Sequence, residues 1–114
     1  MQITGKTLLR DLQSGFPRFK IKPDWINPDG SILGHPVIND FARFICDTSH
    51  ADADEVERAL SFLESAVTSK DEYIRDLAWE CLETLESCEN FDNIHIHFGQ
   101  NTQALWQTIN QSRR

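Results

Sequence analysis

The chain has 114 residues, of which 11 are basic and 18 acidic, so its formal net charge at neutral pH is −7. This length is typical of one domain with a single hydrophobic core, and we expect one helical domain over residues 1–114. The small number of glycines and prolines, 5 and 4, argues against a disordered chain. The acid excess argues against a protein that grips nucleic acid by its phosphates, because that requires a basic face.

The first third of the chain combines two short helices with an irregular segment. Leucines at helical spacing predict a helix over residues 6–14. Residues 16–35 hold three of the four prolines and are expected to be irregular, although their pattern allows one short strand near residues 19–22. A second helix is predicted from Pro36 to Cys46, because proline suits the first helical turn.

The middle of the chain carries the clearest helical pattern. Acidic capping residues begin two helices, one near Asp52 and one near Asp71. In each, apolar residues then continue at helical spacing. Only about three residues, 68–70, separate the two helices, and so short a connection forces an antiparallel helical hairpin.

The spacing of apolar residues changes near the end of the chain. Apolar residues alternate with His95 and His97, which allows a brief strand or extended segment over residues 94–98. Asn101 or Thr102 can then cap a last helix. Together these patterns predict a mostly all-α fold of about five helices around a central antiparallel hairpin, with room for one or two very short strands.

The three cysteines predict free thiols. Cys81 and Cys88 fall on one face of a helix about 10 Å apart, too far for a disulfide. We therefore expect buried thiols in a reducing compartment. No signal peptide and no membrane-spanning apolar run is visible, so the sequence predicts a cytoplasmic protein with no membrane partner.

The negative charge is concentrated in one part of the chain. Residues 1–46 carry six basic and four acidic residues, residues 47–92 carry three and fourteen, and residues 93–114 carry two and none. The three net charges are +2, −11 and +2, so the whole acid excess lies on the hairpin.

The acids of the second hairpin helix fall opposite its apolar stripe. Like charges four residues apart destabilise a helix by about a few tenths of a kcal/mol per pair, and only Arg75 is close enough to relieve them. An aromatic beside carboxylates is typical of an interface for a cationic partner, although a solvated acidic face has the same pattern. The predicted partner-binding residues are Glu72, Asp76, Trp79, Glu80, Glu83 and Glu86.

Two other patterns suggest metal chemistry. His95 and His97 would share one side of a strand, but no third ligand is identifiable nearby. Some helical hydrolases hold Mg²⁺ with clustered carboxylates, but acids three residues apart drift around the helix and cannot converge. Those acids are Glu80, Glu83, Glu86 and Glu89. We therefore expect no catalytic residues, no metal and no cofactor.

Several stretches together carry a family resemblance. These stretches are residues 60–64, 71–77 and 81–86 of the hairpin, and the ending Phe98-Gly99-Gln100-Asn101-Thr102 followed by Trp106. Over residues 52–110 the chain resembles small helical bacterial immunity proteins of polymorphic-toxin and contact-dependent inhibition systems. The resemblance implies a non-enzymatic protein that neutralises a basic toxin domain, of nuclease type, through its acidic face. A generic helical adaptor or regulatory subunit and, more distantly, a small metal-dependent hydrolase are the alternatives.

Overall fold

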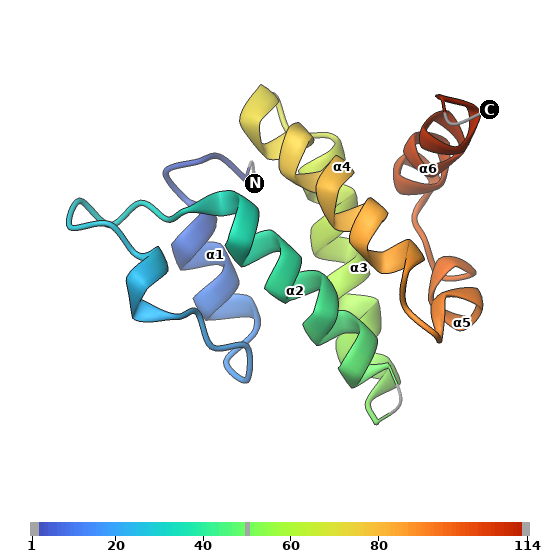
Figure 1. Cartoon of the computed structure of the whole chain (residues 1–114), viewed down its shortest axis with the longest axis horizontal. Coiled ribbons are helices and arrows are strands. Elements are labelled where there is room, and N and C mark those ends of the chain that lie inside the picture. Colours follow the sequence, from blue (N-terminus) through green and yellow to red (C-terminus); the bar gives the residue numbers. More distant parts are fainter. Residues whose placement is uncertain (1–2, 50, 113–114) are drawn as a thin grey trace.

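The fold consists of helices joined by short connections, as the computed structural model in Figure 1 shows for residues 3–49 and 51–112. In the described residues there is no strand, and the one β-bridge joins Ile26 to Ile32. The all-α fold expected from the sequence is therefore confirmed. The elements are α1 (Leu8–Gly15), the 3₁₀ turn η1 (Pro23–Trp25), α2 (Gly34–Thr48), α3 (Ala53–Val67), α4 (Glu72–Glu86), α5 (Phe91–His95) and α6 (Gln100–Ser112).

Helix α4 lies at the centre of the arrangement. It packs against α2 on one side and against α3, its antiparallel partner in the predicted hairpin, and it also touches α6. In Figure 1, α2 and α4 run in front, α3 runs behind them, α1 lies at one end and α5 and α6 at the other. This placement leaves one side of α4 facing outward, between α2 and the C-terminal segment.

The hydrophobic core is one cluster, and α1, α2, α3 and α4 all contribute to it. The largest side chains that it buries fully include Leu12 of α1, Phe41 of α2, Leu63 of α3 and Leu77 of α4. Burying such a side chain contributes about 1.5–3 kcal/mol. The core therefore fixes which side of each helix faces inward.

The helix starts of the hairpin follow the predicted capping residues. The side chain of Asp52 accepts a hydrogen bond from the backbone N–H of Glu55 at 3.1 Å. The side chain of Asp71 accepts one from the backbone N–H of Tyr73 at 3.0 Å. Each bond satisfies a donor that the first helical turn leaves without a partner.

The short strands that the sequence allowed are absent from the described residues. Residues 91–95 form the short helix α5, which buries Ile94 and leaves Ile96 65% exposed. The alternation of residues 94–98 therefore does not reflect two faces of a strand, because only one of its isoleucines reaches the core. Residues 19–22 form no strand either. The bridge between Ile26 and Ile32 closes a turn in which Gly30 has a φ of 88°, a conformation that suits glycine.

The expectation of three free cysteines is also wrong. Cys46 and Cys88 form a disulfide, with Cα atoms 6.0 Å apart, within the usual range. Spacing along one helix keeps Cys81 and Cys88 apart. Tertiary packing, however, brings Cys46 at the end of α2 beside Cys88, which follows α4. Cys81 is free and fully buried, and burial, helped by the charge of Glu80, raises the pKa of its thiol to about 12.

Candidate binding surface on helix α4

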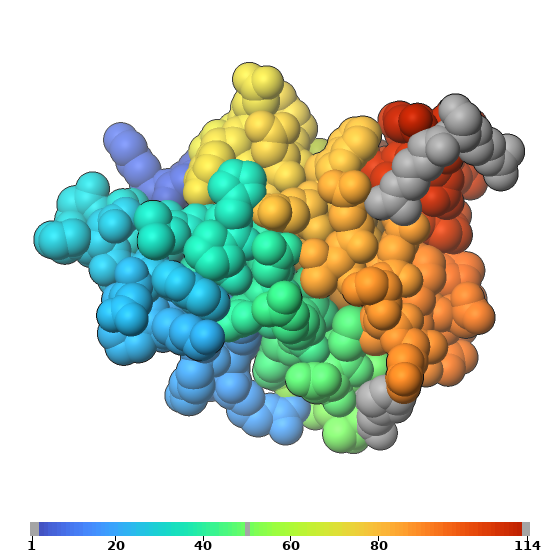
Figure 2. Space-filling model, in the orientation of Figure 1, coloured from blue at the N-terminus to red at the C-terminus, as the bar shows by residue number. Residues whose placement is uncertain are grey.

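The outward side of α4 is set by the core on its other side. Helix α4 buries Ile74, Leu77, Cys81 and Leu85, which recur at three- and four-residue steps. Residues on the opposite side of α4 therefore turn away from the core. In Figure 2 this outward side lies in view, between α2 and the C-terminal segment.

Four carboxylates follow this outward side, and we call Glu72, Asp76, Glu80 and Glu83 the acidic stripe. Glu72, Asp76 and Glu83 are exposed, as their spacing predicts. Glu80 is half-buried, because its Oε2 lies 2.5 Å from Nδ1 of His35 on α2. The structure thus brings together the four acids that the sequence placed on one face.

The two flanking residues of the predicted site are less accessible than the stripe. Trp79 is half-buried and packs against the hydrophobic core. Glu86 is also half-buried. They lie at the edge of the surface, so a partner would meet only part of each side chain.

Arg75 is the one basic residue of α4, and its Nη1 donates a hydrogen bond to the backbone carbonyl of Ser69 at 2.7 Å. This bond ties the guanidinium to the turn between α3 and α4. Glu72 and Asp76 of the stripe remain exposed to solvent.

Two exposed apolar side chains adjoin the stripe, and sequence analysis assigned neither to the site. Tyr73 is 39% exposed and Leu33 is 46% exposed. Their positions are linked through Gly34, the residue after Leu33, whose backbone N–H donates to the Tyr73 hydroxyl at 3.1 Å. A Cβ at Gly34 would lie 2.1 Å from that oxygen, so the close approach requires glycine. Tyr73 shares the helical spacing of the stripe and could have been found from it, whereas Leu33 joins only through tertiary packing.

The family of the chain follows from comparison with known proteins. A model of a domain of unknown function, DUF7674, matches residues 9–114. The chain belongs to the DUF7674 family. The match includes all six helices apart from the first residue of α1, and it includes the acidic stripe with Tyr73 and Leu33. No curated protein and no solved structure matches the chain significantly.

The two histidines considered as metal ligands lie in different surroundings in the DUF7674 domain. His95 packs among aromatic rings, with its ring centroid 5.2 Å from that of Phe91 and 5.0 Å from that of Trp106. His97 instead borders a groove of about 340 Å³ between α3 and the start of α6. Within residues 3–49 and 51–112, no three His, Cys, Asp or Glu side chains form a group suited to a metal ion.

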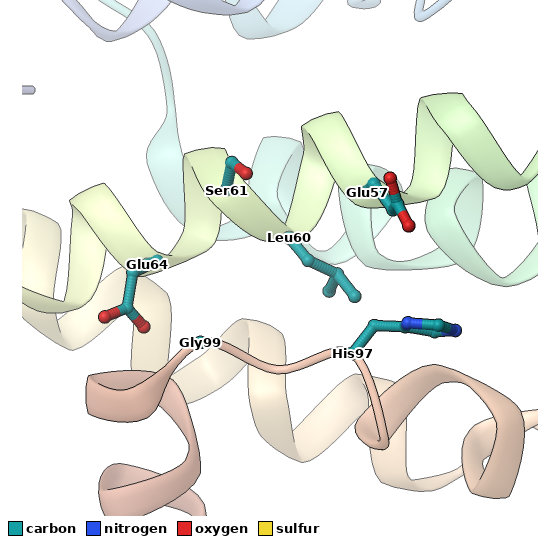
Figure 3. A pocket seen from close by; sticks show the side chains of 6 residues that line it. All are labelled: Glu57, Leu60, Ser61, Glu64, His97 and Gly99. Carbon is teal, nitrogen blue, oxygen red and sulfur yellow. The ribbon is translucent and has the colours of Figure 1, made fainter.

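Figure 3 shows that groove, where Glu57 and His97 face a common space and Glu64 turns toward the start of α6. Both oxygens of Glu64 accept hydrogen bonds from the backbone and side chains of Asn101 and Thr102, at 2.7–3.0 Å. Burial alone would raise the pKa of Glu64, but these four bonds outweigh it and lower the pKa. Glu64 therefore serves as the cap of α6, a role that sequence analysis gave to Asn101 or Thr102.

Gly99 leaves room for this cap. A Cβ at Gly99 would lie 2.5 Å from Oε1 of Glu64, so a larger residue there would displace the carboxylate.

None of the described helices is both long enough and apolar enough to cross a lipid bilayer.

Proposed function

We propose that this chain is a non-enzymatic binding protein that neutralises a basic toxin domain, of nuclease type, in the manner of an immunity protein. The binding face is the outward side of α4, formed by the acidic stripe with Trp79 and Glu86 at its edge. A protein of this kind acts in the cytoplasm, where the toxin would do its damage.

The observation that carries the proposal is the exposed charge of the stripe. Glu72 and Asp76 are exposed one turn apart, and the only arginine of their helix is hydrogen-bonded to Ser69 instead. A row of outward carboxylates carries repeated negative charges, and a basic cleft that binds phosphates can bind such a row. Such a field also attracts a basic partner over distance and raises the association rate.

The direct test is protection of cells. We expect a gene for such a toxin domain beside the gene of this chain, and the two products are expressed together while growth is measured. We expect the natural chain to restore growth. The variant that neutralises the stripe, Glu72→Gln with Asp76→Asn, Glu80→Gln and Glu83→Gln, should protect much less.

A matched control separates the stripe from total charge. Asp47, Asp54, Glu57 and Glu89 are exposed and lie within residues 47–92 but outside the stripe. Changing them to Asn or Gln alters the net charge by the same amount, and we expect protection to remain. Failure of the natural chain to protect would refute the immunity function, and equal loss in both variants would refute the role of the stripe.

A further inference from the structure

The exposed apolar residues continue the acidic stripe rather than interrupt it. Tyr73, Asp76, Glu80 and Glu83 follow one another at steps of three, four and three residues, which places them on one side of α4. Leu33 directly precedes Gly34, whose backbone N–H donates to the Tyr73 hydroxyl. An apolar spot therefore stands at the N-terminal end of the row of carboxylates.

A cavity of about 550 Å³ opens beside Tyr73. This volume lies within the range of sites that bind small organic groups, about 300–1,000 Å³. Its walls come from the N-terminal segment, the chain before α2 and the start of α4. The lining residues are Thr4, Gly5, Lys6, Ser31, Ile32, Asp71 and Tyr73.

The cavity suits an apolar side chain better than a cationic one. Both carboxylate oxygens of its only acid, Asp71, already accept backbone N–H groups, from Gly5 at 2.8 Å and from Tyr73 at 3.0 Å. Lys6 adds a positive charge to the lining. Ile32 and the ring of Tyr73 supply apolar surface, so a cation would gain little here and an apolar group would be desolvated.

We infer that the partner binds through a segment in which an apolar side chain is flanked by basic residues. The apolar side chain enters the cavity beside Tyr73 and covers Leu33, and the basic residues lie along the acidic stripe. This inference rests on the proposed function, since it names the part of the partner that the same face receives. It commits to a protein partner, because the apolar anchor and the row of charges must belong to one chain.

The two parts of this surface should act on different steps of binding. The stripe acts at a distance and sets the association rate, which falls as salt screens it. The anchor is buried only in the complex, so it sets the dissociation rate. Mutations in the two parts are therefore distinguishable by kinetics.

The test uses two synthetic peptides, Ac-Lys-Lys-Trp-Lys-Lys-NH₂ and Ac-Lys-Lys-Ser-Lys-Lys-NH₂, titrated into the full chain. We expect the tryptophan peptide to bind about tenfold more tightly, which corresponds to burial of one large apolar side chain after the costs of ordering it. Methyl NMR should show that this peptide shifts the resonances of Ile32 and Leu33.

Leu33→Ser is the informative variant, and Ile96→Ser is its control. Both replace an exposed large apolar residue, at 46% and 65% exposure, so neither should affect folding much. Leu33→Ser should remove most of the preference for tryptophan and speed dissociation. Ile96→Ser, which lies beyond α5, should leave the preference unchanged.

The outcomes separate this inference from the proposed function. Equal affinity for the two peptides, or a preference that Leu33→Ser leaves intact, overturns the apolar anchor. If salt and the four stripe substitutions still weaken both peptides in that case, the acidic binding face stands without the anchor. If the stripe substitutions change neither peptide's binding, the acidic face fails as well.

Discussion

Helices α3 and α4 belong to one hairpin and both carry several carboxylates, but they use them in opposite ways. On α3, Glu55 is 1% exposed and forms an ion pair with Arg18, and Glu64 caps the first turn of α6. On α4, Glu72 and Asp76 of the acidic stripe are exposed, and its half-buried member, Glu80, contacts His35 of α2. Residue type is the same in both helices, so burial and the available donors determine the role.

The difference shows what each set of acids does for the protein. A carboxylate removed from water must find donors, and in doing so it joins parts of the chain that are distant in sequence. Glu55 joins the segment after α1 to α3, and Glu64 joins α3 to α6. Glu72 and Asp76 are exposed on α4, one helical turn apart, and repel each other. Under the proposed function they serve recognition of the partner.

The largest expected effect comes from the covalent link that encloses both helices. The Cys46–Cys88 disulfide has a sequence separation of 42, and closing a loop of that length stabilises a fold by about 4 kcal/mol in the chain-entropy model. We expect a dithiol reductant to lower the free energy of unfolding by an amount of that order, measured by urea denaturation.

The variant Cys46→Ser with Cys88→Ser should match the reduced protein and should no longer respond to reductant. Cys81 should resist alkylation until the chain unfolds, because it is fully buried. If the reduced chain keeps its full stability, the disulfide does not stabilise the fold, and the prediction is wrong. A cytoplasmic immunity protein should also still bind its toxin when reduced.

The second effect concerns the buried acid of α3. Arg18→Ala removes the main counter-ion of Glu55 and leaves Arg58, whose Nη2 is 3.9 Å from the carboxylate. A buried charge that loses its partner costs about 3 kcal/mol. Arg43→Ala, which breaks an ion pair with Asp40 within α2, should cost less than about 1 kcal/mol because that arginine is exposed. Equal losses would mean that Glu55 gains nothing from the pair.

The third effect concerns the cap of α6. Glu64→Ala removes four hydrogen bonds to one carboxylate and should cost about 2 kcal/mol at neutral pH. Glu57→Ala, on the same helix but exposed, should cost little. Urea denaturation of both variants gives the comparison, and hydrogen exchange should localise the loss to residues 100–104.

The effect of Glu64 should also depend on pH. Its pKa in the folded chain lies below the ordinary value of 4.5, so the carboxylate form is favoured by folding. Its contribution to stability is therefore complete above pH 4.5 and is lost as the pH falls through the folded pKa. Natural chain and Glu64→Ala should converge in acid. A constant difference between them down to the lowest pH would contradict the ionic character of the cap.

Sequence patterns predicted the parts of the molecule that depend on local chemistry. The capping acids Asp52 and Asp71, the hairpin and the outward acids of α4 all follow from spacing along one or two helices. The strand expected at residues 94–98 was wrong because alternation over five residues does not reveal which side chains reach a core. The bond between Cys46 and Cys88 depends on how α2 lies against the end of α4.

The same limit applies to the candidate site. Spacing placed the four acids of the stripe correctly, but it ranked Trp79 as the aromatic of the surface, whereas Tyr73 is the more exposed ring. The roles of Glu55 and Glu64 were not visible either, because their partners Arg18, Asn101 and Thr102 lie 37 or 38 positions away in the sequence. Long-range packing decides which of many similar acids is structural.

The smallest expected effect tests the exposed acids themselves. Asp76 has Glu72 and Glu80 four residues away on either side, so Asp76→Asn relieves two repulsive pairs. Aspartate and asparagine have similar helix propensities. We therefore expect stability to rise by about 0.3–0.6 kcal/mol at low salt.

The control for this variant is Glu57→Gln on α3, which has no acid four residues away on either side. It should change stability less, and added salt should abolish the gain from Asp76→Asn, because screening weakens exposed charge pairs. A loss of stability instead would show that Asp76 supports the fold. Asp76 would then have a structural role like the inward acids of α3, and the contrast between the two helices would not hold for this residue.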